Sequence, residues 1–141
     1  ILFSSAPTKI TKNILATKAF TVSMATVEQL AACDYVGIVS GNREPDKFSK
    51  AGFTALRSEA VNAPIIEQLP MTLECEMVSY DKESNHLVGR IVNVSADEKI
   101  LTDGKIDLGK LRPITYDPIN HHYIALGEVA GNAFSDGKKL K

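Results

Sequence analysis

The sequence contains no tryptophan, only two cysteines, and no excess of charge of either sign. Its 16 basic and 17 acidic side chains give a formal net charge of -1. Such a balance leaves no large field of one sign to attract nucleic acid or an anionic membrane, so we expect neither as a partner. A small anionic ligand needs only a local cluster of donors, and the balanced charge does not exclude one.

The two cysteines, Cys33 and Cys75, match neither a CxxC pair nor a dense disulfide framework. This usage favours a reducing compartment, and we expect a cytoplasmic protein. No apolar run approaches the roughly 20 residues that a membrane-spanning helix needs, and no signal-peptide pattern is present.

The common signatures of nucleotide-binding and hydrolytic sites are absent as well, since the chain has no GxGxxG, GxxxxGK[ST], GxSxG or HExxH. His121 and His122 are adjacent and would point to opposite faces of a strand, so they cannot both ligate one metal ion. Cys33 has no histidine at a readable spacing and is interpreted as packing. The sequence therefore predicts neither a metal site nor a side-chain nucleophile.

The length of 141 residues and the 44% hydrophobic content fit one globular domain, residues 1–141. The first three residues, Ile-Leu-Phe, are apolar and lack an initiator methionine. We interpret them as the end of a strand and expect the native protein to start earlier, so that the domain is N-terminally incomplete.

Two long extended segments, residues 71–80 and 86–96, predict an antiparallel hairpin around the polar stretch between them. The other predicted strands are short, and no regular β-α-β alternation appears. This pattern favours a mainly β fold with peripheral helices (β or α+β), built as a mixed antiparallel barrel rather than a doubly wound sheet.

The predicted helices lie at the periphery of this fold. Residues 9–18 carry apolar side chains at helical spacing. Thr26, with Gln29 three residues later, has the form of a capping box and predicts a helix that ends near Gly37. A short helix is expected after Pro45, and a loop is expected to run on to Pro64.

Two polar segments are candidates for ligand binding. The segment APTKITKN puts Lys9 and Thr11 at a helix start, where backbone N–H groups, a hydroxyl and an ammonium could hold a phosphate. The alternative is an ordinary capped helix with a solvated lysine. The segment SGNREPDKF offers Ser40 and Gly41 in a turn, followed by Lys47. Its alternative is a plain surface loop.

Three segments carry a family resemblance in this order: CDYVGIVSGNREPDKF, APIIEQLPMTLEC and HHYIALGEVAGNAF. The segment HLVGRIVNVSADE, followed by DGKID, lies between the second and the third. Together they resemble the flavin-reductase-like FMN-binding family, flavoredoxins in particular, over essentially the whole chain. The resemblance implies a split β-barrel of Greek-key antiparallel strands that forms a homodimer and holds FMN near the subunit interface. It also implies further N-terminal strands.

The resemblance also implies roles for single residues. Lys9 and Thr11 fall near the family's phosphate-binding turn, although Lys9 and Ile10 depart from the commoner arginine and aromatic residue. Lys47 and His86 match flavin-contacting residues. By itself His86, at a strand start, could equally be a solvated side chain. The full candidate cofactor site comprises Lys9, Thr11, Ser40, Gly41, Lys47, His86 and Tyr123, the last matching an aromatic residue near the ring.

The expected function is that of an FMN-binding oxidoreductase that reduces flavin with NAD(P)H. No catalytic side chain is required, because the flavin carries the redox chemistry. The alternative is an electron carrier of the flavoredoxin type, which passes electrons between redox protein partners and has no substrate of its own. A third possibility, a barrel that has lost its flavin, rests on the departures at Lys9 and Ile10.

Overall fold

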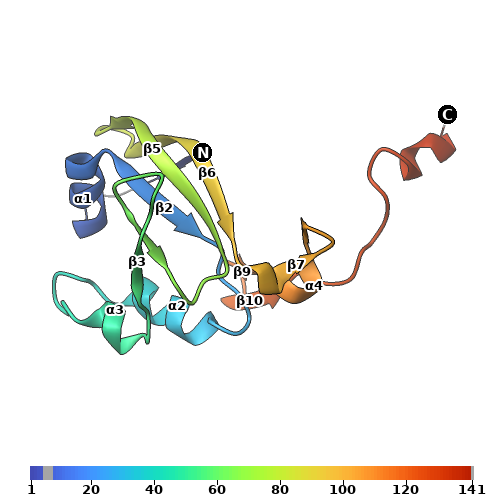
Figure 1. Ribbon diagram of the computed structural model, residues 1–141, viewed down its shortest axis with the longest axis horizontal. Coiled ribbons are helices and arrows are strands. Elements are labelled where there is room, and N and C mark those ends of the chain that lie inside the picture. Colours follow the sequence, from blue (N-terminus) through green and yellow to red (C-terminus); the bar gives the residue numbers. More distant parts are fainter. Residues whose placement is uncertain (5–7, 141) are drawn as a thin grey trace.

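The computed structural model describes residues 1–4 and 8–140 of the chain, with a sheet at its centre and helices at its edge (Figure 1). Its helices are α1 (Lys9–Thr17), α2 (Leu30–Ile38), α3 (Lys47–Lys50), α4 (Leu108–Leu111) and the 3-10 turns η1 (Glu98–Ile100) and η2 (Asp136–Leu140). Its strands are β1 (Leu2–Ser4), β2 (Ala19–Ser23), β3 (Ala55–Arg57), β4 (Pro64–Ile66), β5 (Met71–Asp81), β6 (His86–Ala96), β7 (Leu101–Thr102), β8 (Lys105–Ile106), β9 (Ile114–Asp117) and β10 (His122–Ala125).

The main sheet has the antiparallel strand order β1-β6-β5-β2. Within this sheet β2, β5 and β6 follow one another in sequence and lie side by side, while the first strand, β1, lies beside the last, β6, which is a Greek-key arrangement. The hairpin expected from the two long extended segments is confirmed as β5 and β6. Two register irregularities interrupt it, between Glu74 and Cys75 and between Met77 and Ser79. Irregularities of this kind bend a strand and increase its twist, as a barrel wall requires.

The hydrophobic core lies between α1 and this sheet. Ile14 of α1 packs with Phe20, Cys75 and Leu87, all of them buried. The ring of Phe20 packs directly on the backbone of Gly89 in β6, because a Cβ at this position would overlap the ring. Burial raises the pKa of the Cys75 thiol, so this cysteine serves packing rather than reactivity.

Two local expectations were wrong. The loop predicted to reach Pro64 contains a hairpin, in which β3 pairs antiparallel with β4. Pro64 is tolerated because it is the first residue of its strand. The capping box predicted at Thr26 does not form. Thr26 is buried and bridges Pro113, and α2 starts only at Leu30, without a side-chain cap.

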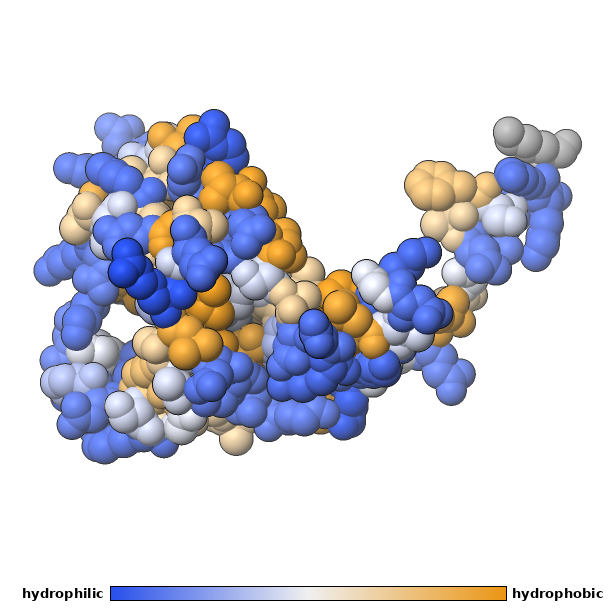
Figure 2. All heavy atoms as spheres, viewed as in Figure 1, coloured by the Kyte–Doolittle hydropathy of each residue, from blue (hydrophilic) through white to orange (hydrophobic). Residues whose placement is uncertain are grey.

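The last described residues, 127–140, leave the body as an extended arm (Figure 1). The arm carries apolar side chains that contact almost nothing, with Val129, Phe134 and Leu140 each at least 88% exposed. Figure 2 shows hydrophobic atoms near the tip of this arm. Among the described residues, no helix is long and apolar enough to cross a lipid bilayer.

Candidate functional site

The start of α1 carries two of the residues predicted to bind a ligand. Thr8 caps the helix, since its hydroxyl accepts a hydrogen bond from the Thr11 amide at 3.5 Å. In return the Thr8 amide donates to the Thr11 hydroxyl at 3.4 Å. The predicted helix start is confirmed. Thr11 is 3% exposed and its hydroxyl belongs to the cap, whereas Lys9 is exposed and keeps its ammonium at the surface.

The turn containing Ser40 and Gly41 lies between two lysines from different helices. A Cβ built on Gly41 would lie 3.5 Å from Cε of Lys47 and 3.7 Å from Cδ of Lys9. Lys9 comes from the first turn of α1, and Lys47 from the start of α3. The fold thus brings together three of the predicted residues that are far apart in sequence.

Lys47 is held in place by the end of α2. Its ammonium donates to the carbonyl oxygens of Val36 at 2.7 Å and Val39 at 2.8 Å. These carbonyls lie at the C-terminal end of α2, where helical acceptors lack partners and the helix dipole favours a cation. An ammonium has three N–H donors, so one remains for a ligand.

A cavity of about 580 Å³ opens beside this lysine. Lys47 is the one charged residue among the described residues that line it. Most of the wall is apolar and comes from α1, β2, α3 and the segment after it, including Ile10, Phe20, Phe48 and Phe53. An apolar wall with a single cation suits a ligand that combines a ring with an anionic group.

Tyr123 is attached to α2. Among the described residues, no hydrogen bond joins it to Lys9 or Lys47. Its hydroxyl donates to the carboxylate of Asp34 at 2.7 Å. This hydrogen bond, together with partial burial and the negative charge of Asp34, raises the pKa of Tyr123. The ring also packs against Tyr116, with centroids 5.7 Å apart.

His86 is exposed at the first position of β6, opposite Asp81 of β5 and Ser4 of β1. Residues 5–7, which connect Ser4 with the cap of α1, lie outside the described residues. The structure therefore gives His86 a place at the hairpin end of the sheet. A contact between His86 and the lysine group remains a prediction.

A second polar arrangement, which no sequence pattern predicted, is centred on the buried carboxylate of Glu74. Glu74 is 1% exposed and accepts hydrogen bonds from Ser58, Ser95 and, at 2.7 Å, Asn93. Burial by itself raises the pKa of Glu74, but these hydrogen bonds together outweigh burial and hold the pKa below its ordinary value of 4.5. The ionised form is therefore the stable one.

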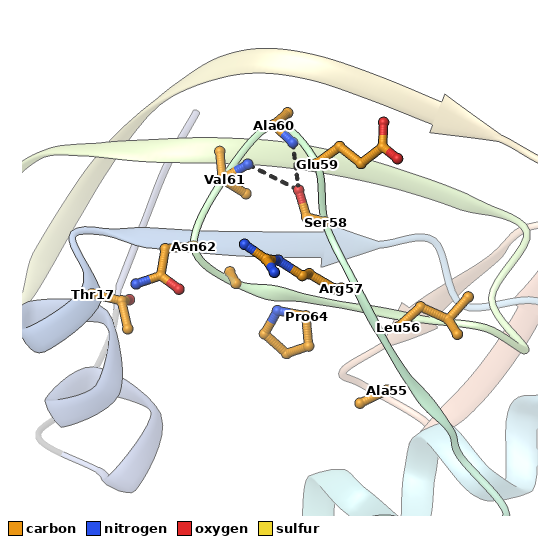
Figure 3. Close-up of a pocket in the computed structure, with 11 residues that line it drawn as sticks. Thr17, Ala55, Leu56, Arg57, Ser58, Glu59, Ala60, Val61, Asn62 and Pro64 are labelled. Carbon is orange, nitrogen blue, oxygen red and sulfur yellow. Dashed lines mark hydrogen bonds between the residues drawn. The ribbon is translucent and has the colours of Figure 1, made fainter.

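This carboxylate anchors the loop that joins β3 to β4. Ser58 donates to Glu74 while its oxygen accepts from the amides of Ala60 at 3.0 Å and Val61 at 2.9 Å (Figure 3). The loop borders a cavity of about 700 Å³, lined by residues 55–64 and Thr17. Arg57 and Asn62 lie in this wall, and neither was predicted as a site residue.

The described residues contain no cluster of three or more histidine, cysteine, aspartate or glutamate side chains that could hold a metal ion. His121 is instead occupied by a local contact, because its Nδ1 lies 2.6 Å from the hydroxyl of Tyr116.

Comparison with known proteins shows the family of this chain. The sequence profile of the family described as "Flavin reductase like domain" matches residues 1–125. The chain belongs to this flavin reductase-like family. The matched span includes all seven candidate cofactor-binding residues, from Lys9 to Tyr123.

Among solved structures, flavoredoxin of Desulfovibrio vulgaris (Miyazaki F) is 33% identical with a TM-score of 0.89, over 96% of this chain and 74% of that one. Flavoredoxin from Methanosarcina acetivorans is 26% identical with a TM-score of 0.87, over 100% of this chain and 75% of that one. These likenesses confirm the predicted split-barrel fold of the family, although the sheets formed by the described residues do not close into a ring.

A curated relative, an uncharacterized protein of Aquifex aeolicus, is 28% identical over 83% of this chain and 61% of its own length. The chain spans about half to three-fifths of the length of the curated relatives that it matches.

Proposed function

We propose that this flavin reductase-like protein binds FMN and takes part in electron transfer, with Lys9, Gly41 and Lys47 at the phosphate end of the site. The observation that carries the proposal is the convergence of two lysines, from α1 and α3, on a residue without a side chain. The 33% identity to a flavoredoxin supports it.

The donor set fits a phosphate. Lys9 is exposed and makes no hydrogen bond or ion pair with any described residue, and it sits at the N-terminal end of α1, where the helix dipole favours an anion. Lys47 has one ammonium donor left and a fixed position. Gly41 leaves open the space that a Cβ would fill between them. The apolar cavity beside Lys47 would accept the ring.

Bound FMN would supply the redox chemistry, while the chain binds and orients it. In this proposal Thr11 positions Lys9, because its buried hydroxyl completes the cap that fixes the first turn of α1. Ser40, His86 and Tyr123 are proposed as further contacts of the flavin.

For the activity, we propose NAD(P)H-dependent reduction of flavin, which agrees with the family. The second candidate is electron transfer between redox protein partners, which the similarity to two flavoredoxins favours. Anaerobic mixing of the FMN-loaded protein with NADH or NADPH separates the two. Bleaching of the flavin absorbance at catalytic rates supports the reductase, and bleaching only over minutes supports the carrier.

Flavin binding itself is tested by titrating FMN and riboflavin into apoprotein. Lys9→Ala is expected to weaken FMN by about tenfold to a hundredfold, because a charge-assisted hydrogen bond to the phosphate is lost. Riboflavin lacks the phosphate and should bind Lys9→Ala as it binds the wild type. The control is Lys105→Ala, which removes an exposed lysine on β8. Equal FMN affinities for wild type and Lys9→Ala would remove Lys9 from the site.

We further propose a homodimer, because the chain exposes more surface than its size requires. Its accessible surface is 9916 Å². A compact monomer of this length exposes roughly 7,100 Å², and a standard interface buries roughly 800 Å² on each partner. The exposed apolar residues of the arm and of β6, including Phe134, Val92 and Val94, are surfaces that a second copy would cover.

Sedimentation equilibrium tests the homodimer. A monomer that holds FMN stoichiometrically would contradict it. Because both cysteines are free, we also propose the reducing cytoplasm as the location. Trapping the thiols with an alkylating agent in intact cells, followed by mass analysis, would show whether they are reduced there.

A further inference from the structure

Arg57 is the last residue of β3, and its guanidinium extends into the space enclosed by the β3–β4 loop (Figure 3). Asn62 and Glu59 also line the cavity; the amide of Asn62 is turned toward Thr17, and the carboxylate of Glu59 points away from the guanidinium (Figure 3). The cavity here measures about 700 Å³. Its wall therefore carries a cation and an amide, and the lining acid, Glu59, directs its carboxylate away from the cation.

Neither polar group has a partner. Within residues 1–4 and 8–140, the side chains of Arg57 and Asn62 make no hydrogen bond, and Arg57 makes no ion pair. Two other arginines differ in this respect, since Arg90 within β6 pairs with Glu76 at 2.6 Å and Arg112 at the end of α4 pairs with Glu28 at 2.7 Å, whereas Arg43 also makes no ion pair with a described residue. Arg57 thus has no ion-pair partner among the described residues, and its guanidinium is directed into a cavity.

The loop that presents Arg57 is fixed rather than loose. Ser58, the next residue, is 4% exposed and joins the loop to the buried carboxylate of Glu74, while two loop amides donate to its oxygen. Burying an ionised carboxylate is costly unless hydrogen bonds compensate it, and here three side chains do so. The arrangement holds the loop backbone next to Arg57 in one geometry, as a binding site requires.

The surroundings indicate the class of ligand. A guanidinium recognises carboxylate and phosphate groups through two parallel N–H donors, and a carboxamide can add a third. Thr17, Asn62, Ala63 and Pro64 also line the apolar cavity of about 580 Å³, so the two cavities adjoin along this stretch of chain. A ligand with an anionic group and an apolar ring would find both chemistries side by side.

We propose that Arg57 and Asn62 form a second ligand site, which binds the carboxylate or phosphate group of a small molecule and is distinct from the flavin phosphate site at Lys9 and Lys47. The two sites lie on different elements, one at the β3–β4 loop and the other between α1 and α3. The second site does not require the proposed flavin function to be correct.

Two matched pairs of probes test the site: adenosine monophosphate with adenosine, and benzoate with benzamide. Each is titrated into isotope-labelled protein while the backbone amide signals of residues 57–63 are followed by NMR. The charged member of at least one pair is expected to shift these signals and to bind at least tenfold more tightly than its neutral partner. Binding of the monophosphate alone identifies a phosphate site, and binding of benzoate alone a carboxylate site.

Arg57→Gln is expected to weaken the charged probe by about tenfold to a hundredfold. Arg57→Lys keeps the charge but loses the two-pronged geometry and should fall in between. The matched control is Arg43→Gln, which removes an exposed arginine from the turn before α3. The proposal is overturned if neither charged probe binds at the loop, or if Arg43→Gln weakens binding as much as Arg57→Gln does.

Titration of Arg57→Gln with FMN and riboflavin keeps the two sites apart. Unchanged affinity for both flavins is expected. A loss confined to FMN would assign Arg57 to the flavin phosphate and would overturn the claim of a second site, whatever the result for Lys9.

Discussion

Two charged side chains, Glu74 and Lys47, hold neighbouring segments in place, but they differ in how far they are buried. Glu74 is buried in the sheet, where three side chains donate to it, and it anchors the β3–β4 loop. Lys47 is only partly buried and donates to two carbonyls at the end of α2. The difference teaches that a fully satisfied buried charge serves architecture, whereas a partly satisfied one at a cavity retains capacity for a ligand.

The largest expected effect is that of removing the buried carboxylate. Glu74→Ala leaves the donors of Ser58, Asn93 and Ser95 without their acceptor and opens space in the sheet. The free energy of unfolding should fall by about 3 kcal/mol, measured by urea denaturation. Glu76→Ala is the control, since Glu76 is half exposed and pairs with Arg90 at the surface, a pair worth about 0.5 kcal/mol. Equal losses in both variants would contradict the comparison.

The next effect is on acid stability. The folded pKa of Glu74 lies below its ordinary value of 4.5. Its contribution is therefore present above about pH 4.5 and is lost as the pH falls through the folded pKa. Ser58→Ala removes one of the hydrogen bonds that lower this pKa, so the loss of stability should begin at a higher pH. Urea denaturation over a series of pH values measures it, and superimposable profiles, apart from a constant offset, would argue against Glu74 as the titrating group.

A smaller effect is expected at Lys47. Lys47→Ala removes the donor to two carbonyls at the C-terminal end of α2, at a cost of about 1 kcal/mol in the free energy of unfolding. Lys50→Ala, three residues later, removes an exposed lysine that pairs with Glu44 and should not produce a comparable loss. If Lys47→Ala unfolds at the wild-type urea concentration, the lysine does not hold α2.

The smallest effect concerns the exposed pair of Tyr123 and Asp34. The hydrogen bond and charge of Asp34 raise the pKa of Tyr123 above 10.0. A raised folded pKa stabilises the protein below the ordinary pKa, and this contribution is lost as the pH rises through the folded pKa. Asp34→Asn should shift the last phenolate transition to lower pH in an ultraviolet titration of the four tyrosines. The assignment loses its support if the variant titrates as the wild type does.

Local pattern predicted the elements whose signals are contained in a few residues. The β5–β6 hairpin follows from two alternating runs around a polar turn, and the start of α1 follows from its polar first turn and helical spacing. The capping box at Thr26 had an equally good local form. It failed because a distant segment, at Pro113, takes Thr26 into a bridge and delays α2 until Leu30. Tertiary contacts here override a local preference.

The candidate site divides in the same way. The resemblance singled out Lys9, Gly41 and Lys47, and the fold brings them together. Arg57 and Asn62 were missed because the signal for their hairpin, two strands of three residues with Pro64 at the start of the second, resembles a loop. Turn-forming residues at Asn62 and Pro64 with β-branched residues after them were the clue that could have indicated it.

By itself, the sequence determined the mainly β architecture, the long hairpin, and the family whose profile the chain matches. The architecture and the hairpin depend on periodicity and composition, which are properties of short stretches, whereas the family is indicated by the resemblance of several segments in order. Only the tertiary structure decided that Lys47 caps α2, that Glu74 is buried and yet ionised, and that Arg57 faces a cavity without making an ion pair to a described residue. Burial and hydrogen-bond partners come from segments distant in the chain, and they fix what each charge can do.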